Sequence, residues 1–443
     1  MSRFSPQLLL AALRQFSSAP RYWIAYSGGL DSHVLLHALT VIRGDLSADL
    51  NGVHINHGLS KDAGAWSRHC ESVCSELGIP CYIFAVSAAP QSGESREAAA
   101  RRARYAALAE IVQTGDCLLT AHHQDDQAET VLLQMLRGAG PRGLAAMPSY
   151  TEFSRGILGR PLLGFTRDDL HGYAVQEGLR WVDDQSNFDT CYQRNYLRRE
   201  VLPLIKSRWP AMARILSRTA AHCADAAQMM DVIAASDFEN IRGVAPDTIS
   251  INKLLTLLAS NQRNVLRFWF RQAGVLLPET VHLERLYSDV LNATEDRMPR
   301  LAWGGVEVRR YRDLLYLMSP PLSPVDYDQA LVWDMRQTLV LPSGGGRLVT
   351  KETAGTGLKT ELWQSQSITV RYRRGGEKCR PAGARHTRTV KNLFQEKGIP
   401  PWQRDRIPFI YAGDELIAVA GLWICQPWQA GPGELGFEIE WQY

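Results

Sequence analysis

The stretch WIAYSGGLDSHVLLHAL, residues 23–39, joins a short apolar run to a run of helical spacing through the loop Ser27-Gly28-Gly29-Leu30-Asp31-Ser32. This order predicts a strand, a glycine-rich turn and a helix. Glycines let the backbone approach phosphate oxygens, and N–H groups at a helix N-terminus supply positive potential. The loop lacks the lysine of the pattern G-x4-G-K-S/T, so it is a different phosphate loop. An ordinary strand–turn–helix junction is also rich in Gly and Ser, but the context favours an anion site.

Outward from this loop, short apolar runs alternate with helical spacing up to about residue 210. The runs GVHIN (52–56), CYIFAV (81–86) and CLLT (117–120) are each followed by a helical pattern. Strands that alternate with helices of this length predict βαβ units, so residues 1–210 are expected to form an α/β domain with a doubly wound parallel sheet. Ligands of such sheets bind beyond the carboxyl ends of the strands.

The remaining chain divides by pattern into three parts. Residues 211–318 have mostly helical spacing with a strand-like tail, which predicts a helical middle domain. Residues 319–366 are rich in Pro, Gly and Thr and are expected to be a linker with short strands. Residues 367–443 contain four strand-like runs around the helix pattern 389–398, which predicts a small α+β domain.

The composition is that of an ordinary globular protein, and its charge is uneven. Among 443 residues, 49 Lys and Arg nearly balance 46 Asp and Glu, for a net charge of +3. Segment 371–406 alone holds eleven basic residues and three acidic ones, with Tyr372, Phe394 and Trp402 interleaved. Basic groups beside flat side chains suit RNA, although Phe394 is expected to pack in the core. The average charge therefore conceals one basic module and an acidic remainder.

The cysteines and the apolar runs predict a soluble protein of the reducing cytoplasm. The eight Cys are scattered without a C-x2-C pair, which argues against zinc or iron–sulfur ligation and favours unpaired thiols. The first residues resemble an amphipathic helix and not a signal peptide. The longest apolar run, residues 416–425, is too short to cross a bilayer.

A second polar motif, AHHQDDQAET, follows the expected strand 117–120 at its carboxyl end. Helical spacing places Asp125, Asp126 and Glu129 on one face, with His122 beside them. Carboxylates are favoured in a first helical turn, so capping accounts for one or two of these acids. Because two His and three acids converge beside a phosphate loop, we favour a site for Mg²⁺, phosphate or a substrate amine.

These motifs carry a family resemblance. The loop SGGLDS resembles the pyrophosphate-binding loop of the N-type ATP pyrophosphatases, and residues 121–130 resemble the HHxxDDxxET signature of the tRNA(Ile)-lysidine synthetases. Further stretches resemble that family in chain order, namely 54–59, 97–105, 140–144, 160–163, 184–187 and 194–198. One departure is Ala146, where the family pattern has a Gly before Met147.

The resemblance implies that ATP adenylates the C2 oxygen of the wobble cytidine of tRNA(Ile) with a CAU anticodon, and that free L-lysine then displaces AMP. It implies ATP and Mg²⁺ as cofactors, and a homodimer is compatible with it. The implied catalytic residues are Asp31, Arg101, His122, Asp125, Asp126 and Glu129, with Asp31 and Asp126 as Mg²⁺ ligands. The implied ATP-binding residues are Ser27, Gly28, Gly29, Leu30, Asp31, Ser32 and His57. The implied tRNA-binding or lysine-binding residues are Arg104, Arg194, Asn195, Arg198, Arg380, Lys391, Arg404 and Arg406.

Two other functions are compatible with these motifs. A tRNA thiolase can use the same loop, but such enzymes generally need paired cysteines. A non-catalytic RNA-binding protein on an inactive pyrophosphatase domain would not need four acids intact, namely Asp31, Asp125, Asp126 and Glu129. Basic runs are also often only solvated faces, and His57 is equally compatible with a buried structural histidine.

Overall fold

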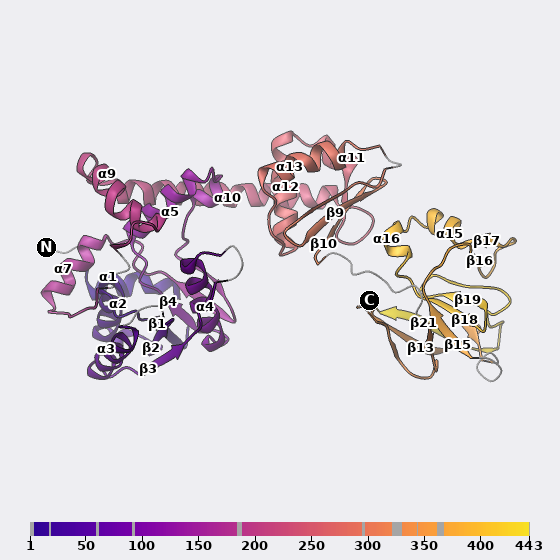
Figure 1. The fold of residues 1–443 in the computed structure, drawn as a ribbon, viewed down its shortest axis with the longest axis horizontal. Helices are drawn as coiled ribbons and strands as arrows, with labels where there is room; N and C mark the ends of the chain where they lie inside the picture. The colour runs from indigo at the N-terminus through magenta and orange to yellow at the C-terminus, as the bar shows by residue number, and fades with distance from the viewer. Residues whose placement is uncertain are drawn as a thin grey trace. The chain divides into compact units, whose positions relative to one another are not determined.

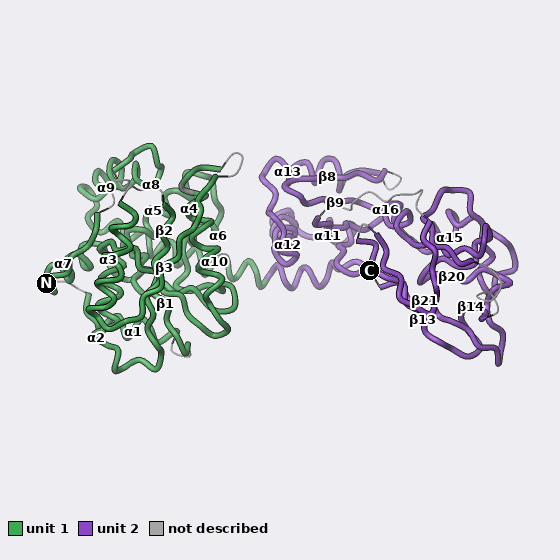
Figure 2. The backbone as a smooth tube through the Cα atoms, turned by 60° about the horizontal axis from the view of Figure 1, so that its bottom comes forward, with its two compact units in different colours: residues 1–232 green, residues 233–443 purple. Residues whose placement is uncertain are grey.

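The computed structural model describes residues 4–16, 19–58, 62–90, 94–183, 188–294, 297–320, 330–342, 344–360 and 367–442. The chain forms two compact units, residues 1–232 and residues 233–443 (Figure 2). Within the described residues, we find no helix with the length and apolar character that crossing a membrane requires.

Unit 1 is built on a six-stranded sheet with the order β3-β2-β1-β4-β6-β5. Its strands are β1 (Arg21–Ala25), β2 (Asp49–Asn56), β3 (Cys81–Ala85), β4 (Cys117–Leu119), β5 (Tyr150–Phe153) and β6 (Gly156–Gly159). All neighbouring pairs are parallel except β5–β6. In register, Ile24 of β1 pairs with Gly52 on one side and Leu119 on the other. The predicted doubly wound parallel sheet is confirmed.

Helices cover both faces of this sheet (Figures 1 and 2). One face carries α1 (Pro6–Leu13), α2 (Leu30–Val41), α3 (Ala63–Glu76) and α7 (Arg167–Gln176), and the other carries α4 (Arg96–Ile111). Successive side chains of a strand point to opposite faces, so Ile24 packs into the α2 and α3 core while Trp23 packs against Leu108 of α4. Burial on both faces explains the nearly continuous apolar runs of these strands.

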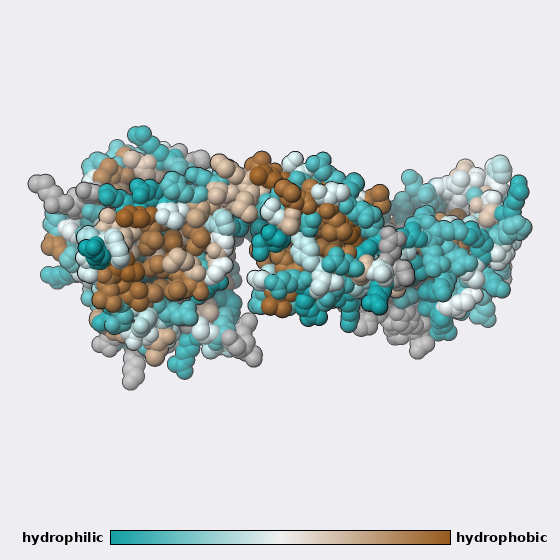
Figure 3. All heavy atoms as spheres, turned by 90° about the horizontal axis from the view of Figure 1, so that it is seen from above, coloured by the Kyte–Doolittle hydropathy of each residue, from teal (hydrophilic) through white to brown (hydrophobic). Residues whose placement is uncertain are grey.

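A helical layer follows the carboxyl end of β4. It contains α5 (Gln124–Leu136), α6 (Pro141–Leu144), α8 (Gln193–Tyr196), a π-helical turn (Leu197–Val201), α9 (Leu202–Arg208) and the long α10 (Met212–Ile241). Ala128, Leu132, Leu197 and Leu202 pack together inside it. Its outer surface, uppermost in Figure 1, shows a broad hydrophobic patch in Figure 3.

Unit 2 begins with a region of helices and one small sheet. The helices are α11 (Ile251–Thr256), α12 (Ala259–Gln272) and α13 (Thr280–Arg285), followed by a π-helical turn (Leu286–Leu291). The sheet has the antiparallel order β7-β10-β9-β8, with β7 (Ile249–Ser250), β8 (Arg300–Trp303), β9 (Val306–Tyr311) and β10 (Leu314–Met318). The helical region is confirmed, and the strand-like tail at its end belongs to a full four-stranded sheet.

The rest of unit 2 is strand-rich. One sheet has the order β11-β15-β18-β19-β20 and another the order β12-β13-β21-β14. The bounds are β11 (Leu331–Val332), β12 (Leu339–Val340), β13 (Arg347–Ala354), β14 (Leu358–Lys359), β15 (Ile368–Arg371), β18 (Phe409–Ala412), β19 (Glu415–Val419), β20 (Trp423–Ile424) and β21 (Leu435–Gln442). A small ladder, β16 (Lys378–Cys379) with β17 (Arg388–Thr389), precedes α15 (Val390–Glu396) and α16 (Pro401–Arg404). The predicted α+β domain is confirmed.

Strand β13 lies in the segment that its composition suggested as a linker. It pairs with β21 over eight residues, from Arg347↔Gln442 to Ala354↔Leu435. A Gly- and Thr-rich stretch does not reveal a partner strand so far along the chain. In the structure these residues therefore contribute to the last sheet.

Two cysteines depart from the expectation of unpaired thiols. Cys379 of β16 and Cys425, directly after β20, form a disulfide with a Cα–Cα distance of 5.4 Å across 46 residues of chain. Both are buried. Their pairing is a property of the fold, because nothing in the spacing of the eight cysteines distinguishes these two.

Candidate active site

Hydrogen bonds of its own serines stabilise the loop after β1. Ser27 N–H donates to Ser32 Oγ at 3.2 Å, Gly29 N–H donates to Ser27 Oγ at 3.3 Å, and the Ser32 hydroxyl donates to Gly29 O at 2.9 Å. Gly28 has φ +84°, and a Cβ there would also lie 3.2 Å from Cys70 Sγ. A side chain is therefore disfavoured at Gly28 by backbone conformation and by space.

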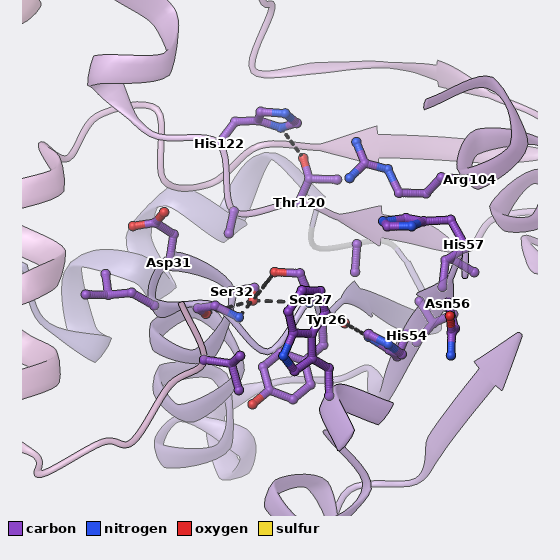
Figure 4. A pocket seen from close by; sticks show the side chains of 18 of the residues that line it. Tyr26, Ser27, Asp31, Ser32, His54, Asn56, His57, Arg104, Thr120 and His122 are labelled. Atoms are coloured by element: carbon purple, nitrogen blue, oxygen red, sulfur yellow. Dashed lines mark hydrogen bonds between the residues drawn. The ribbon is translucent and has the colours of Figure 1, made fainter. Parts of the chain in front are cut away.

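This loop forms one wall of a cavity of about 420 Å³. The cavity lies beyond the carboxyl ends of β1, β2 and β4, where the sequence placed the ligand site, and residues of α4 complete it (Figure 4). Its polar lining includes Ser27, Asp31, Ser32, His54, Asn56, His57, Arg104, Thr120, His122, Arg167, Asp183 and Arg198. The predicted loop residues Gly29 and Leu30 line it as well.

Asp31 is the carboxylate best placed for a cation at this wall. Its Oδ1 atom is buried and accepts no hydrogen bond from the described residues. Its Oδ2 atom lies 3.6 Å from His123 Nε2. No cluster of three or more metal-binding side chains occurs among the described residues. Mg²⁺ commonly uses one or two carboxylates together with substrate phosphates, so this donor set fits Mg²⁺ brought with ATP.

His123 is the residue that sequence reasoning left out of the site. It is the N-cap of α5, where its Nδ1 accepts from Asp126 N–H at 3.3 Å and Asp126 Oδ2 accepts from His123 N–H at 3.0 Å. This capping box turns Nε2 toward Asp31 and Asp126. The second His of the pair at 122–123 was the signal that could have identified it. His123 thus links the phosphate loop to α5.

The acids of α5 face an arginine. Arg198 Nε donates to Glu129 Oε1 at 2.6 Å, and its Nη2 donates to both Glu129 Oε2 at 3.0 Å and Asp126 Oδ1 at 2.9 Å. Burial raises the pKa of Glu129 despite this pairing. Burial acts in the same direction on Asp126, but the charges of His123 and Arg198 outweigh it and lower the pKa of Asp126. Both carboxylates are therefore occupied by protein groups, and Arg198 is the member of this cluster that lines the cavity.

His122 faces the cavity as a neutral imidazole. Its Nδ1 atom lies 2.8 Å from Thr120 Oγ1 (Figure 4). Burial, helped by the charge of Arg160 and opposed by that of Asp126, lowers the pKa of His122 to about 3. At neutral pH this side chain can form hydrogen bonds to a substrate but carries no positive charge.

Of the two arginines of α4 that were predicted to be functional, only one lines the cavity. Arg104 lines the cavity with His57, across from Asp31 (Figure 4). Arg101 is exposed, does not line the cavity, and stacks on Tyr105 with 5.0 Å from its guanidinium carbon to the ring centroid. Asp125 accepts a hydrogen bond from Arg167 N–H at 2.8 Å. The geometry thus brings Arg104 into the site and leaves Arg101 at its margin.

The segment that begins at residue 188 forms hydrogen bonds to α5 and within itself. Arg194 donates to Thr130 Oγ1 at 2.9 Å, and Asn195 Nδ2 donates to Asp189 O at 2.9 Å. These contacts hold the helical segment that carries Arg198. The motif residues 184–187 and Leu59 lie outside the described residues.

The four predicted basic residues of the last domain divide into two pairs. Arg380 and Lys391 are exposed, whereas Arg404 and Arg406 are each only 6% exposed. Arg404 donates to Ile399 O at 2.7 Å and to the Tyr311 hydroxyl at 3.0 Å. Buried arginines that satisfy internal acceptors are poorly placed to contact RNA phosphate.

The interleaved aromatics of segment 371–406 are also engaged within the protein. Tyr372 and Phe394 are buried. Trp402 meets Tyr316 edge to face at 5.4 Å between ring centroids, and Arg309 lies over the Trp402 ring. Among the described residues of this segment, the aromatic rings therefore pack within the protein, while the exposed arginines and lysines face solvent.

Family models match three parts of the chain. A PP-loop domain matches residues 5–205, a TilS substrate binding domain matches residues 249–316, and a TilS substrate C-terminal domain matches residues 368–441. The chain is 45% identical to the tRNA(Ile)-lysidine synthase of Coxiella burnetii over 99% of this chain and 97% of that protein. It is 41% identical to the protein of that name from Methylococcus capsulatus, over 95% of this chain and 96% of that protein.

Two solved structures are similar over shorter lengths. A U34-tRNA thiolase from Methanococcus maripaludis with its 4Fe–4S cluster has 16% identity and a TM-score of 0.42, over 49% of this chain and 77% of that one. A TilS C-terminal domain has 22% identity and a TM-score of 0.23, over 26% of this chain and 98% of that one.

Proposed function

Because this chain belongs to the tRNA(Ile)-lysidine synthase family, we propose that it joins free L-lysine to C2 of the wobble cytidine of tRNA(Ile) with a CAU anticodon. ATP first adenylates the C2 oxygen with release of pyrophosphate, and the ε-amine of lysine then displaces AMP. The observation that carries the proposal at this site is that the loop Ser27–Ser32 shares one cavity with His122, Arg104 and Arg198.

The cavity suits the polyphosphate of ATP. Backbone N–H groups of the loop and the N-terminus of α2 supply positive potential. Arg104, Arg167 and Arg198 line the same space. Guanidinium groups hold phosphate oxygens in a fixed geometry, so these residues support both ATP binding and the negative charge that develops on the departing pyrophosphate.

Mg²⁺ is included in the proposal with Asp31 as its protein ligand. The unpartnered Oδ1 atom of Asp31 carries this assignment. A bound Mg²⁺ would neutralise charge on the phosphate oxygens. Asp126, the other ligand suggested by the sequence, is already paired with His123 and Arg198, so we assign it to positioning these two side chains.

The lysine amine must lose a proton before it attacks, since the reference pKa of lysine is about 10.4. With its pKa near 3, His122 is too weak a base for this step, so we assign it to hydrogen bonding. Asp31 and Asp183 are the carboxylates among the described residues that line the cavity. With Asp31 assigned to Mg²⁺, we propose that the exposed carboxylate of Asp183 binds the lysine ammonium, whose proton passes to solvent before the amine attacks.

The tRNA body is proposed to contact parts of the chain outside the catalytic domain. We propose residues 1–210 as that domain and residues 211–318 and 367–443 as tRNA-contacting domains, with strands β11 to β14 of segment 319–366 completing the sheets of the last one. The excess of basic residues in segment 371–406 supports this division. A tRNA substrate also supports a cytoplasmic location.

A lysine-transfer assay tests the function. Full-length protein is incubated with ATP, Mg²⁺, radiolabelled lysine and tRNA(Ile) transcripts that differ only in C or U at the wobble position. We expect label in the C transcript alone. Asp31→Asn should lower the rate about 100-fold or more, because a charge stabilising the transition state is lost.

Asp45→Asn is the matched control, because Asp45 is an exposed carboxylate that does not line the cavity. It should retain the full rate. Label in both transcripts, or in neither, would refute the proposed function. Equal activity of Asp31→Asn and the unmodified protein would refute the assignment of Asp31.

A further inference from the structure

The segment 188–209 presents aromatic side chains that the fold does not bury. Its inner face is used for packing, where Leu197 and Leu202 contact the core shared with α5 and α10. Elsewhere in the segment Phe188 is 60% exposed, Tyr196 51% and Trp209 59%. Single exposed aromatics are common, but three within 22 residues are not required for this packing.

The same segment is basic. It contains five Lys or Arg residues and two acidic residues. The guanidinium carbon of Arg199 lies 4.5 Å from the centre of the Phe188 ring, and both side chains are exposed. An arginine stacked on an aromatic ring offers flat, positively charged surface, which suits an unstacked nucleobase and its phosphate.

The arginine of this pair is next in the chain to a residue of the active site. Arg199 directly follows Arg198, whose guanidinium lines the cavity and is held by Glu129 at 2.6 Å. Consecutive Cα atoms are about 3.8 Å apart, so the stacked pair begins one residue from the cavity wall. The two arginines lie in a π-helical turn, Leu197–Val201, a geometry that occurs frequently at functional sites.

Resting on the proposed function, we propose that Phe188 and Arg199 form a stacking platform for the anticodon-loop nucleotide next to the wobble cytidine. When the wobble base enters the cavity, its neighbour loses a stacking partner. The Phe188–Arg199 pair replaces that partner at the rim. The platform is a binding element for the RNA and takes no part in the chemical steps.

Steady-state kinetics of Phe188→Ala test the platform. Loss of base–aromatic stacking of this kind should raise the KM for tRNA roughly tenfold. The KM values for ATP and lysine should change less than about twofold. Phe188→Trp should restore the KM for tRNA. Tyr82→Ala is the matched control, because Tyr82 of β3 is 43% exposed and packs against Trp23 away from the cavity lining.

A transcript with an abasic site beside the wobble cytidine identifies the stacked group. It should raise the KM of the unmodified protein about as much as Phe188→Ala does, and should add little in the variant. A full additional loss in the variant, or an equal rise in the KM for ATP, would overturn the platform. An unchanged KM for tRNA in Phe188→Ala would do the same.

The platform can be tested separately from the enzymatic function. Fluorescence anisotropy measures binding of an anticodon stem-loop to the full-length protein without ATP or lysine. Weaker binding by Phe188→Ala, restored by Phe188→Trp, supports the platform even if no lysine is transferred, in which case only the proposed reaction fails. Equal binding by all three proteins would overturn the platform even if lysine is transferred.

Discussion

Arg198 is the residue on which the acidic cluster of α5 depends. Glu129 is 1% exposed and would be an isolated buried charge without the two hydrogen bonds that Arg198 donates to it. Removing one partner of such a pair is strongly destabilising, because the remaining charge stays buried. The cluster therefore links the stability of unit 1 to the position of a cavity-lining guanidinium.

Arg198→Ala should destabilise the protein in a pH-dependent way. Without Arg198, the pKa of Glu129 in the folded state rises further above its unfolded value. A carboxyl group of this kind stabilises the fold only while protonated, and that stability is lost as the pH rises through the folded pKa. We expect a loss of about 3 kcal/mol at pH 8 and a clearly smaller loss at pH 5, measured by urea denaturation.

The double variant Glu129→Gln/Arg198→Ala is the control for this prediction. It has no carboxylate at position 129, so most of the difference between pH 5 and pH 8 should disappear. An equal loss at both pH values in Arg198→Ala would show that packing, and not the buried charge, causes the destabilisation.

Ala146 carries a backbone conformation that suits glycine. Its φ is +55°, and it occupies the position where the family pattern has Gly. A left-handed conformation costs a residue with a Cβ about 1–2 kcal/mol, partly offset by the greater unfolded-state entropy of Gly. Ala146→Gly should therefore raise the free energy of unfolding by about 0.5–1 kcal/mol.

The neighbouring Ala145 provides the comparison. Its φ of −60° is ordinary helical geometry, so Ala145→Gly should lower the free energy of unfolding by about 0.5–1 kcal/mol. Thermal denaturation of both variants measures the two effects. A shift of the same sign in both would show that the conformation at position 146 is not the cause.

At the scale of elements, the disulfide joins the β16–β17 ladder to the end of β20. The ladder lies within the basic segment, with Lys378 and Arg388 on its two strands. By closing a loop of 46 residues, the disulfide lowers the conformational entropy of the unfolded chain. This effect stabilises the folded state by about 4 kcal/mol. Cys379→Ser should lower the stability of this domain by up to about that amount under oxidising conditions.

Cys223→Ser is the thiol control, since Cys223 is unpaired. It should leave the stability unchanged. A reductant should lower the stability of the unmodified protein to about that of Cys379→Ser. Titration of the denatured protein should find six reactive thiols among the eight cysteines. Eight reactive thiols in protein kept without reductant would contradict the pairing.

At the scale of the whole molecule, the separation of charge along the chain predicts a separation of roles. Arg380→Gln with Lys391→Gln removes two exposed cations from the basic segment. We expect a higher KM for tRNA. The slope of log KM against the logarithm of the salt concentration should be smaller by about 1–2, because fewer counterions are released on binding. The KM for ATP should stay nearly unchanged.

Arg347→Gln with Lys351→Gln is the matched control, because both residues are exposed cations of β13 outside the basic segment. The pair should change the salt dependence less than the first pair does. Kinetics between 50 and 200 mM salt measure both slopes. An equal increase in the KM for ATP would contradict the separation of roles.

Local patterns in the sequence were sufficient to predict the loop Ser27–Ser32, the first four strands of unit 1 with the helices that follow them, and the α+β class of the last domain. Each of these depends on residues a few positions apart, since side-chain periodicity and glycine-rich turns act over one or two turns of chain. The same reasoning placed the ligand site at the carboxyl ends of the strands. It expected only short linker strands in segment 319–366 and could not predict that β13 belongs to the last sheet, because its partner strand β21 lies more than 80 residues later.

Only the tertiary structure decided what the charged side chains do. Arg198 and Glu129 are 69 residues apart, Arg404 and Tyr311 93, and Cys379 and Cys425 46. Sequence shows that such residues can pair, but their partners are chosen by packing, which brings distant segments within a few ångströms and excludes water. For this reason Arg404 resembles an RNA-binding residue in the sequence and is a buried structural residue in the fold.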